Sequence, residues 1–445
     1  MGYARRVWGG SMPLWLIPMA YTAGSVLAGL VLPRLENSFL GDYTHAMSVG
    51  AALAFFSAVS SGMMALTGIV FAIAFVAVQF SAVAYSPRLV TLFAGNPTLY
   101  HTLGVFFAAF TYALAALIWT DRGGSGTVPL FSTLLVTTLL IVSLLAFARL
   151  IQSLNDLQIH NVLQVVGKRG RAVIRTMFPP IAGNAAAPPA LPPPDLGPVT
   201  QTLIHSGEPG VVARFDIDEL VRLARRVNGV IAIECGVGET LVEDTAILRV
   251  HRATQIVPER ALRHGIRLAT ARTFEQDPKY AIRLLVDIAI RALSPAINDP
   301  TTAVQALDQI EDLLHRLGRR LLDAGNACDA AGSLRLTFPL PTWEDYLDLS
   351  FDEIRQFGAT SIQVMRRLRA VLVGLAETLT VESRRAAVRQ YLDQLRFGIE
   401  HSEFDVHDRE TALQEDRQGL GLSRRRRGPE SAPAGAGSHP ATPAA

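Results

Sequence analysis

Length, composition and charge exclude several classes of protein. The chain has 445 residues, of which 49% are hydrophobic and only 18% are charged, a composition that fits neither a disordered chain, collagen nor a coiled coil. The 41 basic and 39 acidic residues leave a net charge of +2, so no nucleic acid is expected as a partner. The two cysteines, Cys235 and Cys328, cannot form a disulfide framework and fit a reducing compartment.

The charges are distributed very unevenly along the chain. Only eight of the 80 charged residues precede residue 149. An uncharged stretch of about 20 apolar residues is long enough to cross the ~30 Å hydrocarbon core of a bilayer. Four stretches meet this condition: 14–32, 63–85, 99–120 and 128–148. The second belongs to a longer uncharged run, whose first part, 48–62, is interpreted as an extension or interfacial helix because Ser and Gly interrupt it at 60–62.

Basic residues beside the spans predict their orientation. Most of them, including Arg88, Arg149 and Lys168, fall on one side of the predicted membrane, whereas only Arg34 and Arg122 fall on the other. Loops rich in Lys and Arg stay in the cytoplasm. We therefore predict a multi-pass protein of the cytoplasmic (inner) membrane, with both termini in the cytoplasm.

Shifts in composition divide the chain into a membrane part and a cytoplasmic part. The predicted fold class is an α-helical membrane domain with four transmembrane helices, followed by a cytoplasmic α+β domain that has a small β-barrel-like subdomain and helices. Eight of the twenty residues from 179 to 198 are proline, which marks a semi-rigid linker. The predicted segments are a four-span transmembrane domain (1–152), a juxtamembrane helix (153–178), the Pro-rich linker (179–198), a small β-rich subdomain (199–257), a mostly helical domain (258–398) and a polar tail expected to be disordered (399–445).

Small residues and one amide recur along the second span. Ala65, Gly68, Ala72 and Gln79 follow one another at steps of three, four and seven, so they share one helix face. Small residues let helices approach closely in a membrane, and an amide in hydrocarbon needs a partner. The face is predicted either to pack against another helix or a second copy of the chain, or to line a polar path.

A nearly buried helix with a single polar stripe is predicted at 278–293. Between residues 280 and 293 the only charged side chains are Arg283, Asp287 and Arg291, spaced four apart. Opposite charges at this spacing contribute only about 0.2–0.5 kcal/mol per pair, which does not explain why everything around them is apolar. The stripe is therefore predicted to face water, a partner subunit or a ligand.

The turn that opens the next helix gathers polar residues beside the end of this one. Asp299 and Pro300 are typical of an N-cap and a first helical position, and capping accounts for both. Helix N-termini also hold anions. A small anionic ligand is therefore a hypothesis for this turn, although the charge of Asp299 opposes it; the site would comprise Arg283, Asp287, Arg291, Asn298, Asp299, Thr301 and Thr302.

Two parts of the sequence carry a family resemblance. Residues 291–303, RALSPAINDPTTA, and the helix before them resemble the hallmark of a family of predicted bacterial membrane proteins known as domain of unknown function 2254. The membrane part is similar too, at 67–71 (TGIVF) and 85–89 (YSPRL). The resemblance extends over about 10–415. It implies a polytopic membrane protein with a cytoplasmic domain, and it brings no established activity, substrate or catalytic residue.

The function predicted first is an oligomeric, channel-like or transport-related conduit with a cytoplasmic regulatory domain. The alternative is a membrane-anchored cytoplasmic sensor or scaffold without transport activity. An enzyme ranks third, because the sequence has no P-loop, GxSxG or HExxH motif. No cofactor or metal is expected, since the acidic and histidine residues at 401–408 are interpreted as solvated surface. The predicted partners are the lipid bilayer, further copies of the chain in a homo-oligomer and a small anionic ligand.

Overall fold

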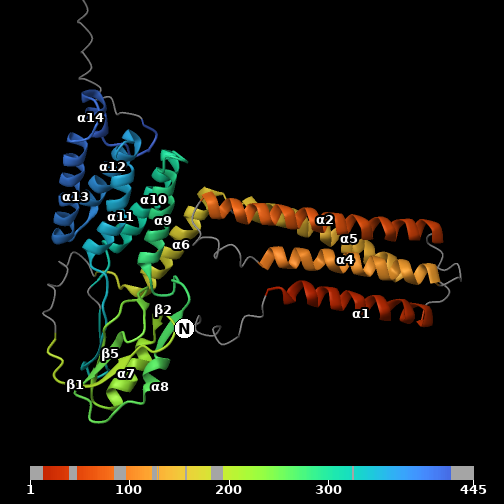
Figure 1. Cartoon of the computed structure of the whole chain (residues 1–445), viewed down its shortest axis with the longest axis horizontal. Coiled ribbons are helices and arrows are strands. Elements are labelled where there is room, and N and C mark those ends of the chain that lie inside the picture. Colours follow the sequence, from red (N-terminus) through yellow and green to blue (C-terminus); the bar gives the residue numbers. More distant parts are fainter. Residues whose placement is uncertain are drawn as a thin grey trace, which may run out of the picture.

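The structure is a computed structural model that describes residues 14–39, 48–84, 97–122, 128, 130–155, 158–181, 194–322 and 325–421. It has two parts (Figure 1): a bundle of long helices, and a globular domain that lies at one end of the bundle. The bundle consists of α1 (Leu16–Phe39), α2 (Val49–Ala84), α4 (Pro97–Arg122) and α5 (Leu130–Asn155).

The bundle is held together around α4. Each of its 4 helices is long and apolar enough to cross a membrane, as the sequence predicted, and α4 contacts the other three. Between α1 and α4, the Ser25 hydroxyl donates to the carbonyl of Ala108 at 2.7 Å. A Cβ on Gly29 would lie only 2.6 Å from the Cβ of Ala115. Small residues and an interhelical hydrogen bond therefore set the approach of these two helices, as is usual inside membranes.

Helix α2 is uninterrupted, so 48–62 is an extension of the spanning helix, one of the two forms expected, and not a separate interfacial helix. The Ser61 hydroxyl donates to the carbonyl of Ser57 at 2.7 Å, which satisfies the serine within the helix. Phe56, in this part of the helix, is fully buried in the bundle. Helix α2 contains no charged residue from Val49 to Ala84. The span thus begins with the first residues of α2, and its other end projects toward the globular domain (Figure 1).

The globular domain contains two β-sheets. The strands of the larger sheet lie in the order β1-β5-β3-β8-β7, and those of the smaller in the order β4-β2-β6. Neither described sheet closes on itself, so a barrel-like form is not confirmed. The strands are β1 (Val199–Ile204), β2 (Gly210–Phe215), β3 (Val230–Ile233), β4 (Thr240–Leu241), β5 (Ala246–His251), β6 (Ile266–Ala269), β7 (Asn326–Cys328) and β8 (Leu334–Thr337). The short helices α7 (Ile217–Arg226) and α8 (Glu259–His264) accompany them.

Helices form the other half of the globular domain. Helix α9 lies at its centre and is packed by α6, α10 and α11. Residues such as Leu284 and Leu285 are fully buried, which agrees with the enclosed helix predicted from the sequence. The helices are α6 (Ile159–Met177), α9 (Pro278–Ala292), α10 (Pro300–Leu317), α11 (Trp343–Phe357), α12 (Ile362–Thr378), α13 (Glu382–Glu400) and α14 (Val406–Ala412).

Three sequence predictions need correction or fall outside the described residues. The mostly helical domain was expected to begin at 258, but α8 ends at His264 and strand β6 follows, because Ile266 pairs with Phe215 of β2. The tail expected to be disordered from 399 is folded up to 421: it includes α14, and the buried Asp416 accepts the backbone N–H of Gly419 at 3.0 Å. Most of the Pro-rich linker (182–193) and the last residues (422–445) lie outside the described chain.

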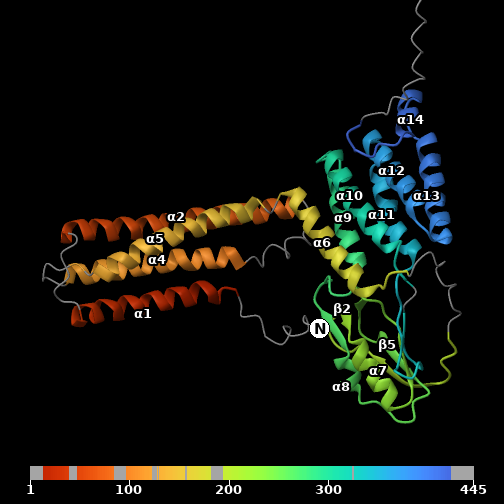
Figure 2. The same cartoon turned by 180° about the vertical axis from the view of Figure 1, so that it is seen from behind.

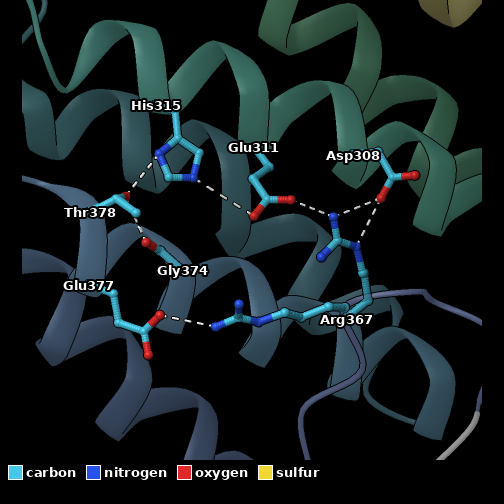
Figure 3. Close-up of polar contacts among 8 residues, drawn as sticks. Asp308, Glu311, His315, Arg367, Gly374, Glu377 and Thr378 are labelled. Carbon is cyan, nitrogen blue, oxygen red and sulfur yellow. Dashed lines mark hydrogen bonds and ion pairs between the residues drawn. The ribbon is translucent and has the colours of Figure 1, made fainter.

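A network of charged side chains joins α10 to α12 (Figure 3). Arg367 of α12 is only 6% exposed, donates to Asp308 at 2.9 Å and also pairs with Glu311. His315 lies 3.8 Å from Glu311 and 3.0 Å from the Thr378 hydroxyl. Burial raises the pKa of Glu311, but His315 and Arg367 together outweigh it and hold that pKa below its usual value. The buried cation is thus neutralised by carboxylates of the neighbouring helix.

Replacing Arg367 by Met should destabilise the protein by about 1.5–3 kcal/mol, since it removes the charge-assisted hydrogen bonds to Asp308 and to Glu311, which is only 24% exposed. Arg417→Met is the matched control: its ion pair with Glu377 is 63% and 59% exposed, and exposed pairs contribute about 0–1 kcal/mol. Thermal unfolding in detergent, followed by circular dichroism, measures both variants. Equal losses in the two variants would contradict a buried role for Arg367.

Candidate functional site

The polar stripe of α9 contacts α11. The Arg283 Nε donates to Asp287 at 2.6 Å, and its two terminal nitrogens donate to both carboxylate oxygens of Glu353 at 2.5 and 2.8 Å. The hydrogen bonds to Glu353 raise the pKa of Arg283 more than burial lowers it. Paired hydrogen bonds of this kind are strong and directional. Arg283 and Asp287 therefore fasten α9 to α11, through a glutamate that no sequence pattern singled out.

The turn between α9 and α10 brings other predicted site residues to one helix start. Asp299 accepts the backbone N–H of Thr302 at 3.1 Å and the Thr302 hydroxyl at 2.6 Å. Asn298 has a positive φ of 49°, a conformation that Asn tolerates. The carboxylate of Asp299 thus occupies donors that an anion would need, and capping describes the turn fully.

Arg291 and Thr301 flank this turn. Arg291 lies in the last turn of α9, and its buried Nε makes no hydrogen bond within the described structure. The side chain of Thr301 is exposed. Arg283 is eight residues earlier on α9, about 12 Å along the helix axis. The predicted residues thus fall into two separate places, and the anionic ligand stays a prediction.

The predicted face of α2 points away from the rest of the chain. Ala65, Gly68, Ala72 and Gln79 are all exposed, and a Cβ on Gly68 would meet nothing within 4 Å. Gln79 lies near the end of α2, five residues before Ala84. Packing against a second copy and lining a polar path both stay predictions, but the amide is not at the middle of the span.

A cavity of about 880 Å³ lies between the sheets and the helices of the globular domain. Its walls are the last turn of α6, β2, the turn before β4, the start of α9 and the loop 338–341. This volume is within the ~300–1,000 Å³ of small-molecule sites. Its carboxylates outnumber its cations: Glu234, Glu239, Glu275, Asp277 and Asp345 face Arg214 and Lys279.

Asp277 is a buried carboxylate in the wall of this cavity. Its side chain is 1% exposed, and its Oδ1 caps α9 by accepting the backbone N–H of Tyr280 at 3.2 Å. The other oxygen, Oδ2, has no hydrogen-bond partner within the described structure, and Arg272 lies 3.6 Å from it. Burial raises the pKa of Asp277, against the opposing charges of Arg272 and Lys279. A buried acceptor without a donor indicates a place where a ligand or water donates.

The neighbouring Gln276 holds this part of the wall in place. Its side-chain oxygen accepts the backbone N–H of Phe215 at 2.9 Å, and its nitrogen donates to the Phe215 carbonyl at 3.1 Å. The amide thus pairs with β2 as another strand would. It ties the start of α9 to the smaller sheet and fixes the position of Asp277 between them.

A second buried polar group lacks a partner near Asp277. Tyr346 of α11 is fully buried, and its hydroxyl makes no hydrogen bond within the described residues. Burial raises its pKa, and the negative charges of Asp277 and Asp345 raise it further. Oδ2 of Asp277 and the Tyr346 hydroxyl thus both lack a hydrogen bond within the described residues, and they are close enough for the charge of Asp277 to act on Tyr346. These two groups make the Asp277 side of the cavity the best candidate site in the described chain.

Comparison with known proteins identifies the family. A family model described as a predicted membrane protein, DUF2254, matches residues 12–373. The chain is a member of the DUF2254 family. An uncharacterized protein of Mycobacterium bovis is 27% identical over 418 residues, which cover 90% of this chain and 78% of the relative. Uncharacterized proteins of two Mycobacterium tuberculosis strains match over the same length at 27% and 26% identity. No solved structure matches the chain significantly.

The DUF2254 region contains both the bundle and the cavity. Every residue that lines the cavity, from Thr176 to Asp345, lies inside the matched segment 12–373. The sequence analysis did not single out Asp277. A signal was present, because Asp277-Pro278 repeats the pattern of Asp299-Pro300 at the start of a helix. The pattern shows the cap, but the burial of the second oxygen depends on the fold.

Asp277→Asn should stabilise this DUF2254 protein at neutral pH. Because burial in the folded state raises the pKa of Asp277 above its ordinary value of 3.8, the native state binds a proton more tightly, and stability is lost as pH rises through the folded pKa. Asn keeps the cap and removes the charge. The melting temperature of the variant minus that of the wild type should be near zero at pH 4 and grow toward pH 7.

Asp277→Ala separates the cap from the charge, since it removes both and should lose about 1 kcal/mol relative to Asn. A difference between Asn and wild type that stays constant from pH 4 to pH 7 would show that ionisation of Asp277 is not costly in the fold.

Proposed function

We propose that the protein is a membrane-anchored sensor, whose cytoplasmic domain binds a small cationic organic molecule in the cavity beside Asp277. The observation that carries this proposal is the course of α6. Helix α5 ends at Asn155, α6 begins at Ile159, and the last turn of α6 supplies Thr176 and Met177 to the cavity wall. One helix thus connects a membrane span to the candidate ligand site.

The charges of the cavity support a cationic ligand. Glu234, Glu275 and Asp277 are each paired with an arginine, at 3.7, 3.3 and 3.6 Å, but the buried Oδ2 of Asp277 accepts no hydrogen bond within the described residues. A protonated amine placed there makes a charge-assisted hydrogen bond, which is shorter and stronger than a neutral one. Phe338 and Leu340, both half-buried in the cavity wall, offer apolar surface for the carbon part of such a ligand.

Packing between α6 and the central helices supports transmission to the membrane. A Cβ on Gly170 of α6 would lie 2.9 Å from Ala281 of α9 and 3.0 Å from Leu313 of α10. Such close contact leaves little freedom for α6 to move independently of these helices. A ligand that prefers one arrangement of the cavity therefore shifts the population of α6 positions at the membrane.

Calorimetric titration of the full-length protein in detergent tests ligand binding, with spermidine and putrescine as probes and citrate as the anionic comparison. We expect saturable binding of a polyamine and none of citrate. Asp277→Asn should weaken the binding at least about tenfold, equivalent to ~1.4 kcal/mol. Glu243→Gln is the control, because Glu243 is exposed on the same domain and does not line the cavity.

Binding of citrate, binding that Asp277→Asn does not change, or failure of both polyamines to bind would refute the cationic site. Loss of binding in Glu243→Gln as well would mean that the effect is general and not local to the cavity.

A second candidate, the oligomeric conduit, is favoured by the outward face of α2. Ala65, Gly68 and Ala72 leave a smooth surface that the described chain does not cover, and such surfaces pack closely in membranes. A conduit lined by copies of α2 needs this surface at its contacts.

Gly68→Leu should therefore dissociate the oligomer and abolish ion flux if the conduit exists. Gly24→Leu on α1 is the control, because a Cβ at Gly24 also meets nothing within 4 Å. Light scattering of the purified protein gives its mass, and flux is measured in liposomes. A wild-type monomer without flux would rule out the conduit and leave the sensor.

A further inference from the structure

Helix α6 has one buried face and one exposed face. Val162, Val166 and Ile174 are fully buried against the core of the globular domain, where α6 contacts α9 and α10. On the opposite face, the exposed residues include Gln164, Val165, Lys168, Arg169, Ala172 and Arg175. We call these six residues the outer face of α6. The two faces follow the helical period, so packing of the inner one fixes the direction of the outer one.

The outer face carries positive charge and no negative charge. Helix α6 contains no Asp or Glu. Arg171, at the edge, is neutralised by Asp312 at 3.0 Å, but Lys168, Arg169 and Arg175 have no ion pair with any described carboxylate. Arg169 lies over the ring of Phe274 at 5.2 Å, which fixes its guanidinium near the surface. Three cations therefore share one helix face.

The outer face is directed at the membrane. Helix α6 begins at Ile159, and α5 leaves the apolar window at Ser153, so the connection spans at most about 20 Å. Figures 1 and 2 both show α6 on the side of the globular domain that is next to the bundle. Its inner face is turned to α9 and α10, on the far side from the bundle. Helix α6 starts beside the end of the bundle and runs obliquely away from it (Figure 1), so Lys168 and Arg169, in its middle, lie nearer to the membrane side than Arg175 in its last turn.

We propose that the outer face of α6 binds anionic lipid headgroups and so holds the globular domain on the membrane surface. Basic residues near an anionic leaflet are attracted over a Debye length of about 8 Å at physiological salt. Val165, 38% exposed, adds an apolar contact at the interface. We choose a lipid surface as the partner because the bundle, once it is in the membrane, keeps the outer face of α6 close to a lipid surface in every molecule.

The experiment uses the full-length protein in detergent, with phosphatidylglycerol or phosphatidylcholine added and the lipid retained after gel filtration counted by mass spectrometry. The test variant combines Lys168→Gln, Arg169→Gln and Arg175→Gln. The matched control combines Arg385→Gln, Arg389→Gln and Arg396→Gln on α13. This helix has the same length as α6, 19 residues, and lies on the side of the domain farthest from the bundle (Figure 1).

The wild type should retain phosphatidylglycerol in preference to phosphatidylcholine, and 0.5 M NaCl should weaken the retention. The α6 variant should lose at least about fivefold of the retained phosphatidylglycerol, while the α13 variant keeps it. A charge-preserving variant that combines Lys168→Arg, Arg169→Lys and Arg175→Lys should retain phosphatidylglycerol as the wild type does. This variant separates electrostatic binding from misfolding. Any one of four results would overturn the proposal. These are equal retention of the two lipids by the wild type, equal retention of phosphatidylglycerol by the wild type and the α6 variant, an equal loss in the α13 variant, and a loss in the charge-preserving variant.

Discussion

The burial of α9 is the constraint on which the globular domain depends. Ala281, Leu284 and Leu285 are fully enclosed, so the helix can be stable only when α6, α10 and α11 all surround it. Within its charged stripe, Arg283 makes a bidentate contact with Glu353 of α11. The free backbone N–H and C=O groups at the ends of a buried helix need hydrogen-bond partners. The residues that supply them therefore shape the structure at each end of α9.

Each end of α9 is closed in a different way. At the start, Asp277 caps the helix with one oxygen and leaves the other in the cavity wall, while Gln276 ties the same turn to β2. At the finish, the chain turns directly into α10, whose cap, Asp299, is satisfied within its own turn. Oδ2 of Asp277 accepts no hydrogen bond within the described residues, whereas both carboxylate oxygens of Asp299 accept one. The two Asp-Pro pairs are therefore chemically different, although their sequences are alike.

Helix α6 relates the two parts of the molecule. Its inner face belongs to the core around α9, its start follows α5, and its last turn reaches the cavity. A change in the cavity and a change at the membrane surface therefore act on the same rigid element. The bundle, in contrast, is organised around α4 and leaves one face of α2 uncovered.

The sequence was informative where one residue type or one local pattern decides the outcome. The four apolar helices follow from the scarcity of charge before residue 149, since hydrocarbon excludes charge wherever the chain folds. The helix around Arg283 and its enclosure follow from its apolar composition, and the family follows from 291–303. Of the two forms expected for 48–62, the structure has the extension and not the interfacial helix, because a serine hydroxyl that bonds the preceding turn does not stop a helix.

Contacts between distant segments were decided only by the tertiary structure. Strand β8 joins β3 in parallel, with Ile231 opposite Leu336, and nothing local to either segment indicates that pairing. Glu353 and Tyr346 lie on α11, far along the chain from the residues they influence. The sequence by itself determined which segments are apolar enough to cross a membrane and that Asp299 caps a helix, because both depend on neighbours within one turn or one span. The cavity, and the oxygen of Asp277 left without a donor, exist only because the fold removes water from groups that are remote in sequence.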